Sequence, residues 1–104
     1  AQHSASASVL LDELAALDLV AVLDPQAGAP SLRGLQALRT QRQANVLRYW
    51  LKTHFGARPS TAQLGELMAQ ISACTTRAHH IDIRVGDGFV RRDGTVVRWY
   101  NFGL

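Results

Sequence analysis

Basic side chains gather in one part of this chain, where they could bind an anion. Between residues 33 and 65 the sequence holds six basic residues and no acid: Arg33, Arg39, Arg42, Arg48, Lys52 and Arg58. Residues 39–51 combine three of these guanidinium groups with helix-like apolar spacing and two aromatic residues. A planar guanidinium can bind phosphate through two parallel hydrogen bonds. This stretch therefore predicts contact with an anionic partner.

Charge is distributed unevenly along the chain. The formal net charge is +3 over 104 residues. Residues 1–32 contain four acids and no Lys or Arg, whereas residues 33–104 carry all eleven basic residues against four acids. Such clustering is typical of proteins that bind nucleic acid or another anionic surface.

Length and cysteine content limit the class of protein. The chain is large enough to bury a core of its own and too short for two domains. No apolar run approaches the roughly 18 residues of a membrane span, and the N-terminal residues lack a signal-peptide pattern. The single cysteine, Cys74, has no partner for an internal disulfide. We expect one cytoplasmic domain over residues 9–104, without membrane contact, after a disordered lead or artificial chain end at residues 1–8.

Hydrophobic spacing predicts three helices ahead of residue 75. The first covers residues 9–22, where leucines recur at helical spacing, and it ends before two prolines and a glycine at residues 24–30. The second covers residues 40–56 and the third about residues 60–74. The segment 32–38 is ambiguous and is at most a short helical turn.

Polar residues mark the starts of the second and third helices. Thr40 with Gln43, and Ser60 with Gln63, have the spacing of a capping box, in which each side chain binds the other's backbone N–H. Gly56 predicts the end of the central helix.

After residue 75 the apolar period changes from that of a helix to that of a strand. Residues 81–85, 89–92 and 95–100 are the predicted strands. Asp93 and Gly94 predict a type I′ hairpin turn, because both central positions of that turn take positive φ. The expected fold class is α+β, with three helices followed by a small three-stranded antiparallel meander packed against them.

The central helix is predicted to have a core face and a wet face. At about 100° per residue, one sector holds Val46, Leu47, Trp50, Leu51 and His54. Trp50 is expected in the core rather than as a stacking platform for bases. The opposite sector carries Arg48 and Lys52 one turn apart, which makes them candidates for phosphate contact.

Arg42 lies near the start of this helix, where the helix dipole disfavours a cation. A cation at such a position indicates a specific use. The sequence leaves two uses open: an ion pair with Asp12 or Glu13, or contact with RNA.

The predicted strands carry further arginines. Arg91 and Arg92 are adjacent, so their side chains point to opposite faces and only one can join a given RNA surface. Arg84 and Arg98, assigned to neighbouring strands, could flank that surface. The aromatic run at residues 99–102 is expected to pack on a helix or against a following domain.

Catalytic and metal-binding patterns are not found in the sequence. His79 and His80, near Cys74, would face apart on a strand, and structural zinc usually needs four ligands. Asp87 and Asp93 fit turn positions. We therefore expect no metal site and no catalytic residue in this chain.

Four short motifs occur in the order of one known family. They are Leu10-Leu11-Asp12-Glu13-Leu14-Ala15, then Arg42-x-x-x-Val46-Leu47-Arg48-x-Trp50-Leu51, then Pro59-Ser60, and a strand ending Val90-Arg91-Arg92. Over roughly residues 9–100 the chain resembles the first C-terminal domain of bacterial tRNA(Ile)-lysidine synthetases. The second motif, followed by Pro-Ser at the expected distance, is the most specific.

The resemblance implies a function that this chain would share with other domains. In that family an N-terminal domain with an S-G-G-x-D-S motif uses ATP and Mg²⁺ to attach lysine to the wobble cytidine of an isoleucine tRNA, and C-terminal domains help to hold the tRNA. This chain lacks that motif. The resemblance thus implies an inactive, tRNA-binding fragment with no cofactor of its own and with a catalytic domain in the same parent chain. The oligomeric state stays open, with a homodimeric parent as one option.

On this basis, seven residues are expected to contact RNA: Arg42, Arg48, Lys52, Arg84, Arg91, Arg92 and Arg98. Three local departures from the family pattern affect such contacts. Gln43 stands where a second Arg is common, Asp93 stands where a Tyr is common, and residues 77–81 replace an Asp-Ala-x-Pro-like stretch.

Two other functions stay open. A winged-helix-like DNA-binding or dimerisation module would have the same order of helix, turn, helix and basic hairpin. Its recognition helix, residues 60–74, would contain no Lys or Arg, which is a poor match to a phosphate-lined groove. The domain could also mainly orient the catalytic domain, with RNA affinity located elsewhere.

Overall fold

A computed structural model describes residues 2–101, with side chains described from residue 6 onward. Its elements are α1 Gln2–Val22, β1 Leu23–Asp24, β2 Ala29–Pro30, α2 Leu32–Ala37, α3 Thr40–Phe55, α4 Thr61–Ala73, β3 Asp82–Val85, β4 Gly88–Asp93 and β5 Val96–Asn101. The predicted α+β class is confirmed. The ambiguous segment at residues 32–38 forms α2, so the described part has four helices rather than three.

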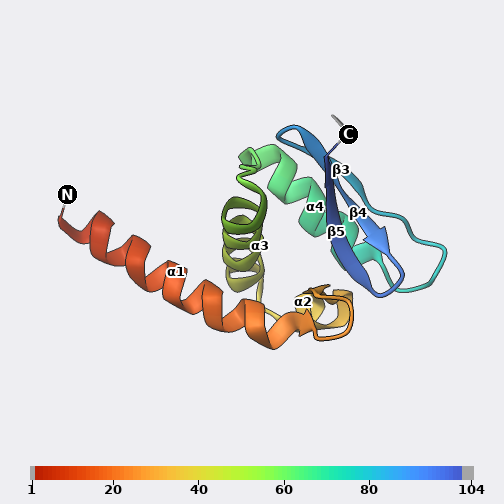
Figure 1. Cartoon of the computed structure of the whole chain (residues 1–104), viewed down its shortest axis with the longest axis horizontal. Coiled ribbons are helices and arrows are strands. Elements are labelled where there is room, and N and C mark those ends of the chain that lie inside the picture. Colours follow the sequence, from red (N-terminus) through yellow and green to blue (C-terminus); the bar gives the residue numbers. More distant parts are fainter. Residues whose placement is uncertain (1, 102–104) are drawn as a thin grey trace.

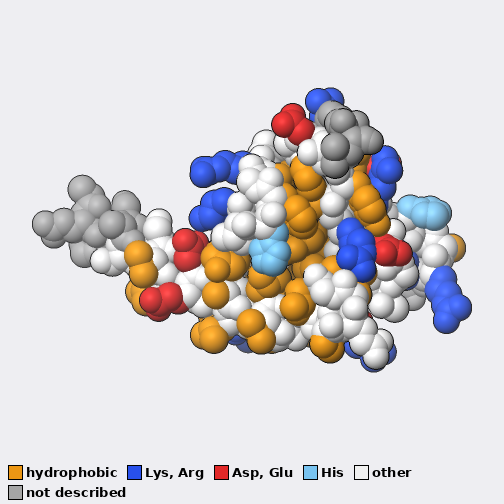
Figure 2. Space-filling view, in the orientation of Figure 1, with side chains coloured by type: hydrophobic (Ala, Val, Ile, Leu, Met, Phe, Trp, Pro, Cys, Tyr) orange, Lys and Arg blue, Asp and Glu red, His pale blue; other side chains and the backbone are white. Residues whose placement is uncertain are grey.

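Helix α1 projects from the body of the molecule (Figure 1). It begins at Gln2, ahead of the predicted start at residue 9. Residues 2–8 contain no Gly or Pro to end a helix, which explains the longer element. One side of α1 is buried through Ala15 and Leu19, whereas Leu17 and Val20 are exposed. Figure 2 shows hydrophobic and acidic side chains together on this projecting arm.

A short hairpin after α1 leads into α2 and contacts the three-stranded sheet. Strands β1 and β2 form a small antiparallel hairpin, closed by Gly28 at φ +67°. Ser31 follows, and its hydroxyl accepts a hydrogen bond from the Gly34 N–H at 3.0 Å, which caps α2. The backbone of Ser31 also forms a β-bridge with Val96 of β5.

The start of α3 differs from the prediction. Arg39 is the N-cap residue, with no side-chain cap bond, and Thr40 is the first helical residue. Gln43 closes no capping box; its Nε2 donates to the Leu35 carbonyl at 2.7 Å and the side chain is buried. A tertiary hydrogen bond to α2 thus takes the place of the predicted cap. Gly56, at φ +63°, ends the helix where expected.

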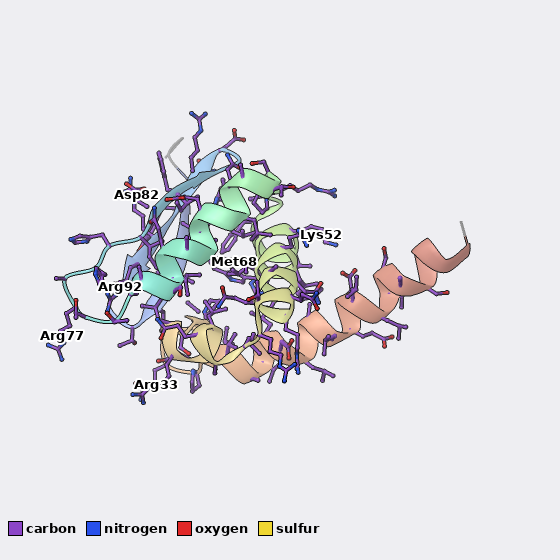
Figure 3. All side chains as sticks on the ribbon, turned by 180° about the vertical axis from the view of Figure 1, so that it is seen from behind. Arg33, Lys52, Met68, Arg77, Asp82 and Arg92 are labelled. Atoms are coloured by element: carbon purple, nitrogen blue, oxygen red, sulfur yellow. The ribbon has the colours of Figure 1, made fainter. Side chains whose placement is uncertain are left out.

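Helix α4 begins with the predicted capping box. Ser60 Oγ accepts from the Gln63 N–H at 3.0 Å, and Gln63 Oε1 accepts from the Ser60 N–H at 2.9 Å. The helix covers one face of the sheet, as both ribbon views show (Figures 1 and 3). Gln70 Oε1 accepts from the Asp82 N–H at 3.0 Å, which ties α4 to β3.

The meander has the order β3-β4-β5, so β4 lies between the strands of Arg84 and Arg98, which are not neighbours. Asp93 pairs with Val96, so the central turn residues are Gly94 and Thr95. Of these only Gly94 has positive φ, at +62°. The predicted type I′ turn is therefore wrong, because that turn takes positive φ at both positions.

The core joins the sheet to α3 and α4. Its fully buried members include Leu47, Leu51, Leu67, Ile71, Val85, Val90 and Val97. Trp50 is 2% exposed, which confirms its place in the core, whereas His54 of the same predicted sector is exposed.

Aromatic rings extend this core to the last strand. Phe55 packs edge-on against Trp50 at 5.3 Å between centroids and stacks on Trp99 at 5.1 Å. Trp99 Nε1 donates to the Val85 carbonyl at 3.0 Å. The prediction that Trp99 packs on a helix is confirmed; Phe102 lies outside the described residues.

Two glycines provide a test of this packing. A Cβ at Gly88 would lie 2.6 Å from the Trp99 ring and would also overlap the Tyr100 carbonyl oxygen, whereas a Cβ at Gly65 of α4 meets nothing within 4 Å. We expect Gly88→Ala to lower the free energy of unfolding by about 3 kcal/mol. Gly65→Ala should raise it by about 0.5 to 1 kcal/mol. Urea unfolding measures both, and a Gly88→Ala variant as stable as the parent chain would contradict the β4–β5 packing.

Candidate nucleic-acid interface

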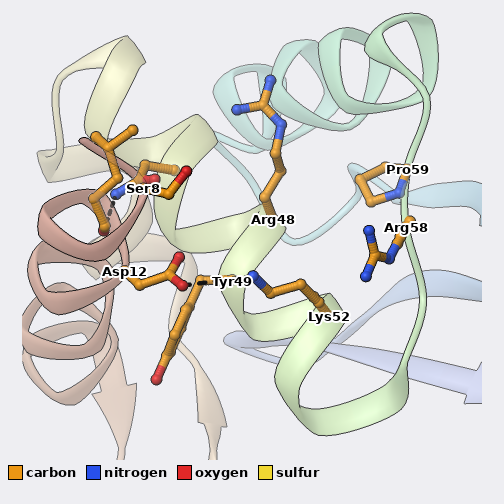
Figure 4. A pocket seen from close by; sticks show the side chains of 9 residues that line it. Ser8, Asp12, Arg48, Tyr49, Lys52, Arg58 and Pro59 are labelled. Carbon is orange, nitrogen blue, oxygen red and sulfur yellow. Dashed lines mark hydrogen bonds and ion pairs between the residues drawn. The ribbon is translucent and has the colours of Figure 1, made fainter. Parts of the chain in front are cut away.

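A hollow of about 400 Å³ lies where α1, α3 and the connection to α4 meet. It is lined by Ser8, Leu11, Asp12, Asn45, Arg48, Tyr49, Lys52, Arg58 and Pro59. Figure 4 shows the long basic side chains entering it from α3 and from the following segment, with Asp12 on the facing helix. Three cations and one carboxylate make this hollow positively charged.

Two of its guanidinium groups are available to a ligand. Arg48 and Arg58 are exposed, and within the described residues neither has a hydrogen-bond or ion-pair partner. Lys52 lies 3.7 Å from Asp12 Oδ2, measured from Nζ, and both side chains are well exposed. Such a long, solvent-exposed pair is weak and easily exchanged. Lys52 can therefore also contact an anion at little cost.

Local sequence explains how these groups meet. Arg48 and Lys52 lie one turn apart on α3, on the side away from Val46 and Trp50. After Gly56 the chain folds back, and the Ala57 N–H donates to the Leu51 carbonyl at 3.0 Å. This reversal brings residue 58 beside the end of the helix. Asn45 Nδ2 donates to the Leu11 carbonyl at 2.8 Å and closes the wall towards α1.

Arg42 has a structural role. Its Nε donates to Asp18 Oδ2 at 3.0 Å and its Nη2 donates to Asp18 Oδ1, so the guanidinium binds both carboxylate oxygens. These hydrogen bonds, together with the negative charge of Asp18, raise the pKa of Arg42 above its ordinary value. The predicted ion pair exists, but its partner is Asp18, because the start of α3 lies beside the last turns of α1, whereas Asp12 faces Lys52 further along α3.

The arginines of the sheet lie apart from the hollow. Alternation along the strands places Arg84, Arg91 and Arg98 on the sheet face that points away from the core. On this face Arg91 of β4 and Arg98 of β5 are cross-strand partners. Arg91 pairs with Asp82 at 3.3 Å, and its guanidinium also lies 4.7 Å from the centre of the Phe89 ring. Arg98 pairs with Asp93 at 2.8 Å.

The Arg92 side chain points to the opposite face of the sheet from Arg91, as the sequence analysis predicted for two adjacent strand residues. Its Nη1 donates to the carbonyls of Thr76 and His79 at 2.7 and 2.8 Å, and its Nε donates to the Gly94 carbonyl at 2.8 Å. This guanidinium is occupied in holding the loop between α4 and β3.

The structure thus groups Arg48 and Lys52 from the seven predicted residues and adds Arg58, which the sequence analysis did not select. The signal was present, since Arg58 belongs to the acid-free basic segment. A residue between two helices has no periodicity to assign it a face, so only the fold shows what it adjoins.

The hollow has the chemistry of an anion site. Guanidinium and ammonium groups bind phosphate, and no group of three or more His, Cys, Asp or Glu side chains in the described part is placed to hold a metal. Within residues 2–101 no helix has the length and apolar character needed to cross a membrane. The fold and this hollow define an α+β domain with a basic, phosphate-compatible surface.

Comparison with known families assigns the domain. The family model of the TilS substrate binding domain matches residues 31–101, so the chain belongs to this family. The resemblance noted from the sequence motifs is confirmed.

Curated relatives agree with this family. A tRNA(Ile)-lysidine synthase of Polaromonas naphthalenivorans is 49% identical over 94 residues, and one of Burkholderia pseudomallei is 44% identical over 73 residues. These alignments cover 90% and 70% of this chain but only 27% and 15% of the relatives. The chain therefore spans about a quarter or less of their length. No solved structure matches it significantly.

The ion pair of Arg42 provides a stability test. Asp18 is 4% exposed, so Arg42→Ala leaves a buried carboxylate without its partner. We expect this variant to melt at least about 5 °C below the parent chain. Arg48→Ala, the matched control on the same helix, should change the melting temperature by less than about 3 °C. Equal melting temperatures in a calorimetric scan would show that the pair does not fix α1 on α3.

Proposed function

We propose that this domain binds the sugar–phosphate backbone of a tRNA and positions it for lysidine formation at the wobble cytidine by another part of the same enzyme. The domain itself contributes no catalytic group. ATP and Mg²⁺ would act outside this segment, in the cytoplasm. The observation that carries the proposal is the pair of available guanidiniums, Arg48 and Arg58, in a hollow of a TilS substrate binding domain.

The chemistry of the hollow supports contact with backbone rather than with bases. Its donors are long, exposed side chains that no hydrogen bond from the described residues holds in one position. Phosphate contacts of this kind set the position of an RNA without reading its sequence. The aromatic residue nearest them, Tyr49, is half-buried, and Trp50 is in the core. Neither presents an open ring face for stacking of an unpaired base.

Family membership also favours this function over the winged-helix alternative. Helix α4, the recognition helix of that alternative, covers one face of the sheet, and Glu66 is its one charged residue. A helix of this composition would meet the phosphates of a DNA groove with a carboxylate and no cation.

The salt dependence of tRNA binding tests the hollow. Each lost phosphate contact should reduce the slope of log K against log [salt] by about 0.7 to 0.9. We expect that reduction for Arg48→Gln and for Arg58→Gln, and a smaller one for Lys52→Gln, because Asp12 already offsets part of its charge. Fluorescence anisotropy of labelled tRNA across a KCl series measures the slope.

Arg91→Gln is the matched control, because it removes one charge from a guanidinium already paired with Asp82. It should change the slope by less than half as much as Arg48→Gln. Equal effects of the two variants would show that binding responds to net charge alone, and an unchanged slope for Arg48→Gln and Arg58→Gln would remove the hollow from the interface.

The non-catalytic role has its own test. Incubation of this chain with ATP, radiolabelled lysine and tRNA should attach no lysine to the RNA. The intact Polaromonas naphthalenivorans tRNA(Ile)-lysidine synthase is the positive control. Lysine incorporation by this chain alone would overturn the non-catalytic reading while leaving tRNA binding in place.

A further inference from the structure

A second basic surface lies at the other end of the molecule from the α1–α3 hollow. Figure 3 shows Arg33, Arg77 and Arg92 gathered there, well separated from Lys52. All three line one hollow of about 580 Å³ between α2, the loop after α4 and the turn before β5. An adjoining hollow of about 480 Å³ shares Arg77 and Arg92 and adds His79 and His80.

The loop at residues 75–80 is held in a defined shape. Arg92 binds two of its carbonyls, those of Thr76 and His79, at 2.7 and 2.8 Å. The Thr75 N–H donates to His79 Nδ1 at 3.2 Å. Because Nδ1 accepts this bond, Nε2 is the ring nitrogen left to contact a ligand. The loop thus presents donors without first having to be ordered.

Two arginines of this surface are available. Arg33 and Arg77 are exposed, and neither has a hydrogen-bond or ion-pair partner among residues 2–101. The acid that lines the hollow, Asp24, already accepts hydrogen bonds from the Gln26 and Ala27 N–H groups at 2.9 and 3.1 Å. Three guanidinium groups and one carboxylate leave this hollow with a net positive charge.

An uncharged hollow extends the Arg33 surface as far as the start of α3. A hollow between α2, α3 and α4 shares Gln36 and Thr75 with the Arg33 hollow and extends to Thr40 and Gln43 at the start of α3. No acid lines it. A polyanion crossing from the Arg33 hollow towards α3 meets no carboxylate in this part of its path.

From this arrangement we propose that Arg33, Arg77, His79 and His80 form a second phosphate-binding surface, which holds the backbone of the same RNA at a point distant from Arg48 and Arg58. The proposal rests on the proposed function. A nucleic acid presents phosphates at regular intervals along its length, so one molecule can occupy both surfaces.

The composition of the surface favours RNA over a protein partner. The core of a protein–protein interface is enriched in aromatic and other apolar side chains. None of the exposed large hydrophobic residues of the described chain lines these two hollows; they are Val9, Leu10, Leu11, Leu17, Val20, Phe55 and Tyr100. Polar donors alone are sufficient for phosphate.

The double variant Arg33→Gln/Arg77→Gln tests the proposal in the same tRNA assay. Its salt slope should fall by about 1.4 to 1.8, for two lost phosphate contacts. Arg48→Gln/Arg58→Gln should lower it by a similar amount, and the four-residue variant by the sum of the two. Arg91→Gln/Arg98→Gln is the control of equal charge, since both guanidiniums already pair with acids. Thermal unfolding confirms that each variant is folded.

The outcomes separate the two proposals. If the chain binds no tRNA, the proposed function fails. If binding depends on Arg48 and Arg58 while Arg33→Gln/Arg77→Gln behaves like the charge control, the second surface does not bind RNA and this inference alone is overturned. In that case an acidic protein surface is the partner to test next for the Arg33 and Arg77 surface.

A crosslink gives an independent readout. Cys74 is the one cysteine and is 7% exposed, so Ala78→Cys on the exposed loop supplies a selective labelling site. A benzophenone attached there should crosslink to tRNA on irradiation. The same label at Val20→Cys, which is 76% exposed on the outer side of α1, measures the background. Equal crosslinking from both positions would contradict the second surface.

Discussion

The bidentate pair between Arg42 and the buried carboxylate of Asp18 fixes α1 on α3, and the shape of the α1–α3 hollow depends on it. Ala15 and Leu19 of α1 are also buried, but apolar packing is not directional and does not by itself define this contact. A buried carboxylate tolerates few alternative positions, since any shift that separates it from its guanidinium leaves a desolvated charge. The pair thus sets the register of the two helices and determines that Asp12 lies opposite Lys52.

Contacts within the fold separate two groups of four arginines. Arg42, Arg91, Arg92 and Arg98 bind carboxylates or backbone carbonyls and join one element to another. Arg33, Arg48, Arg58 and Arg77 have no such partner in the described part of the chain. Net charge therefore overstates the surface open to an anion, because the four guanidiniums of the first group, and that of Arg84 with them, already interact within the fold.

Sequence reasoning succeeded where the signal was local and failed where it depended on how elements meet. The Ser60–Gln63 capping box, the end of α3 at Gly56 and the burial of Trp50 follow from spacing within one element, and the structure has all three. The partner of Arg42 depends on where α3 crosses α1. The sequence of neither helix indicates that position.

The same limit explains the errors at Gln43 and Arg58. A Thr-x-x-Gln spacing favours a capping box in an isolated helix, but in the fold the Leu35 carbonyl of α2 takes the Gln43 amide. The position of Arg58 beside Arg48 results from the reversal after Gly56. In both cases the sequence showed the residue type, and only tertiary packing determined its contact.

One motif of the family combines both kinds of arginine. Arg42 and Arg48 are six residues apart on α3, so their side chains point about 120° apart around the helix axis. The first faces α1 and the second lines the hollow. A substitution at Arg42 would disturb the site indirectly by loosening α1, whereas one at Arg48 would leave the fold intact.

Under the proposed function, exposed phosphate contacts of this kind need not bind tightly by themselves. Each is a screened, flexible interaction, and its strength falls as salt rises. The chain spans at most about a quarter of its relatives, so in a protein of that length a domain such as this one would be tethered to others. Tethering turns later contacts into intramolecular ones with a high effective concentration. Two modest basic surfaces on a rigid fold then suffice to orient a long polyanion, because orientation requires separated contacts more than it requires strong ones.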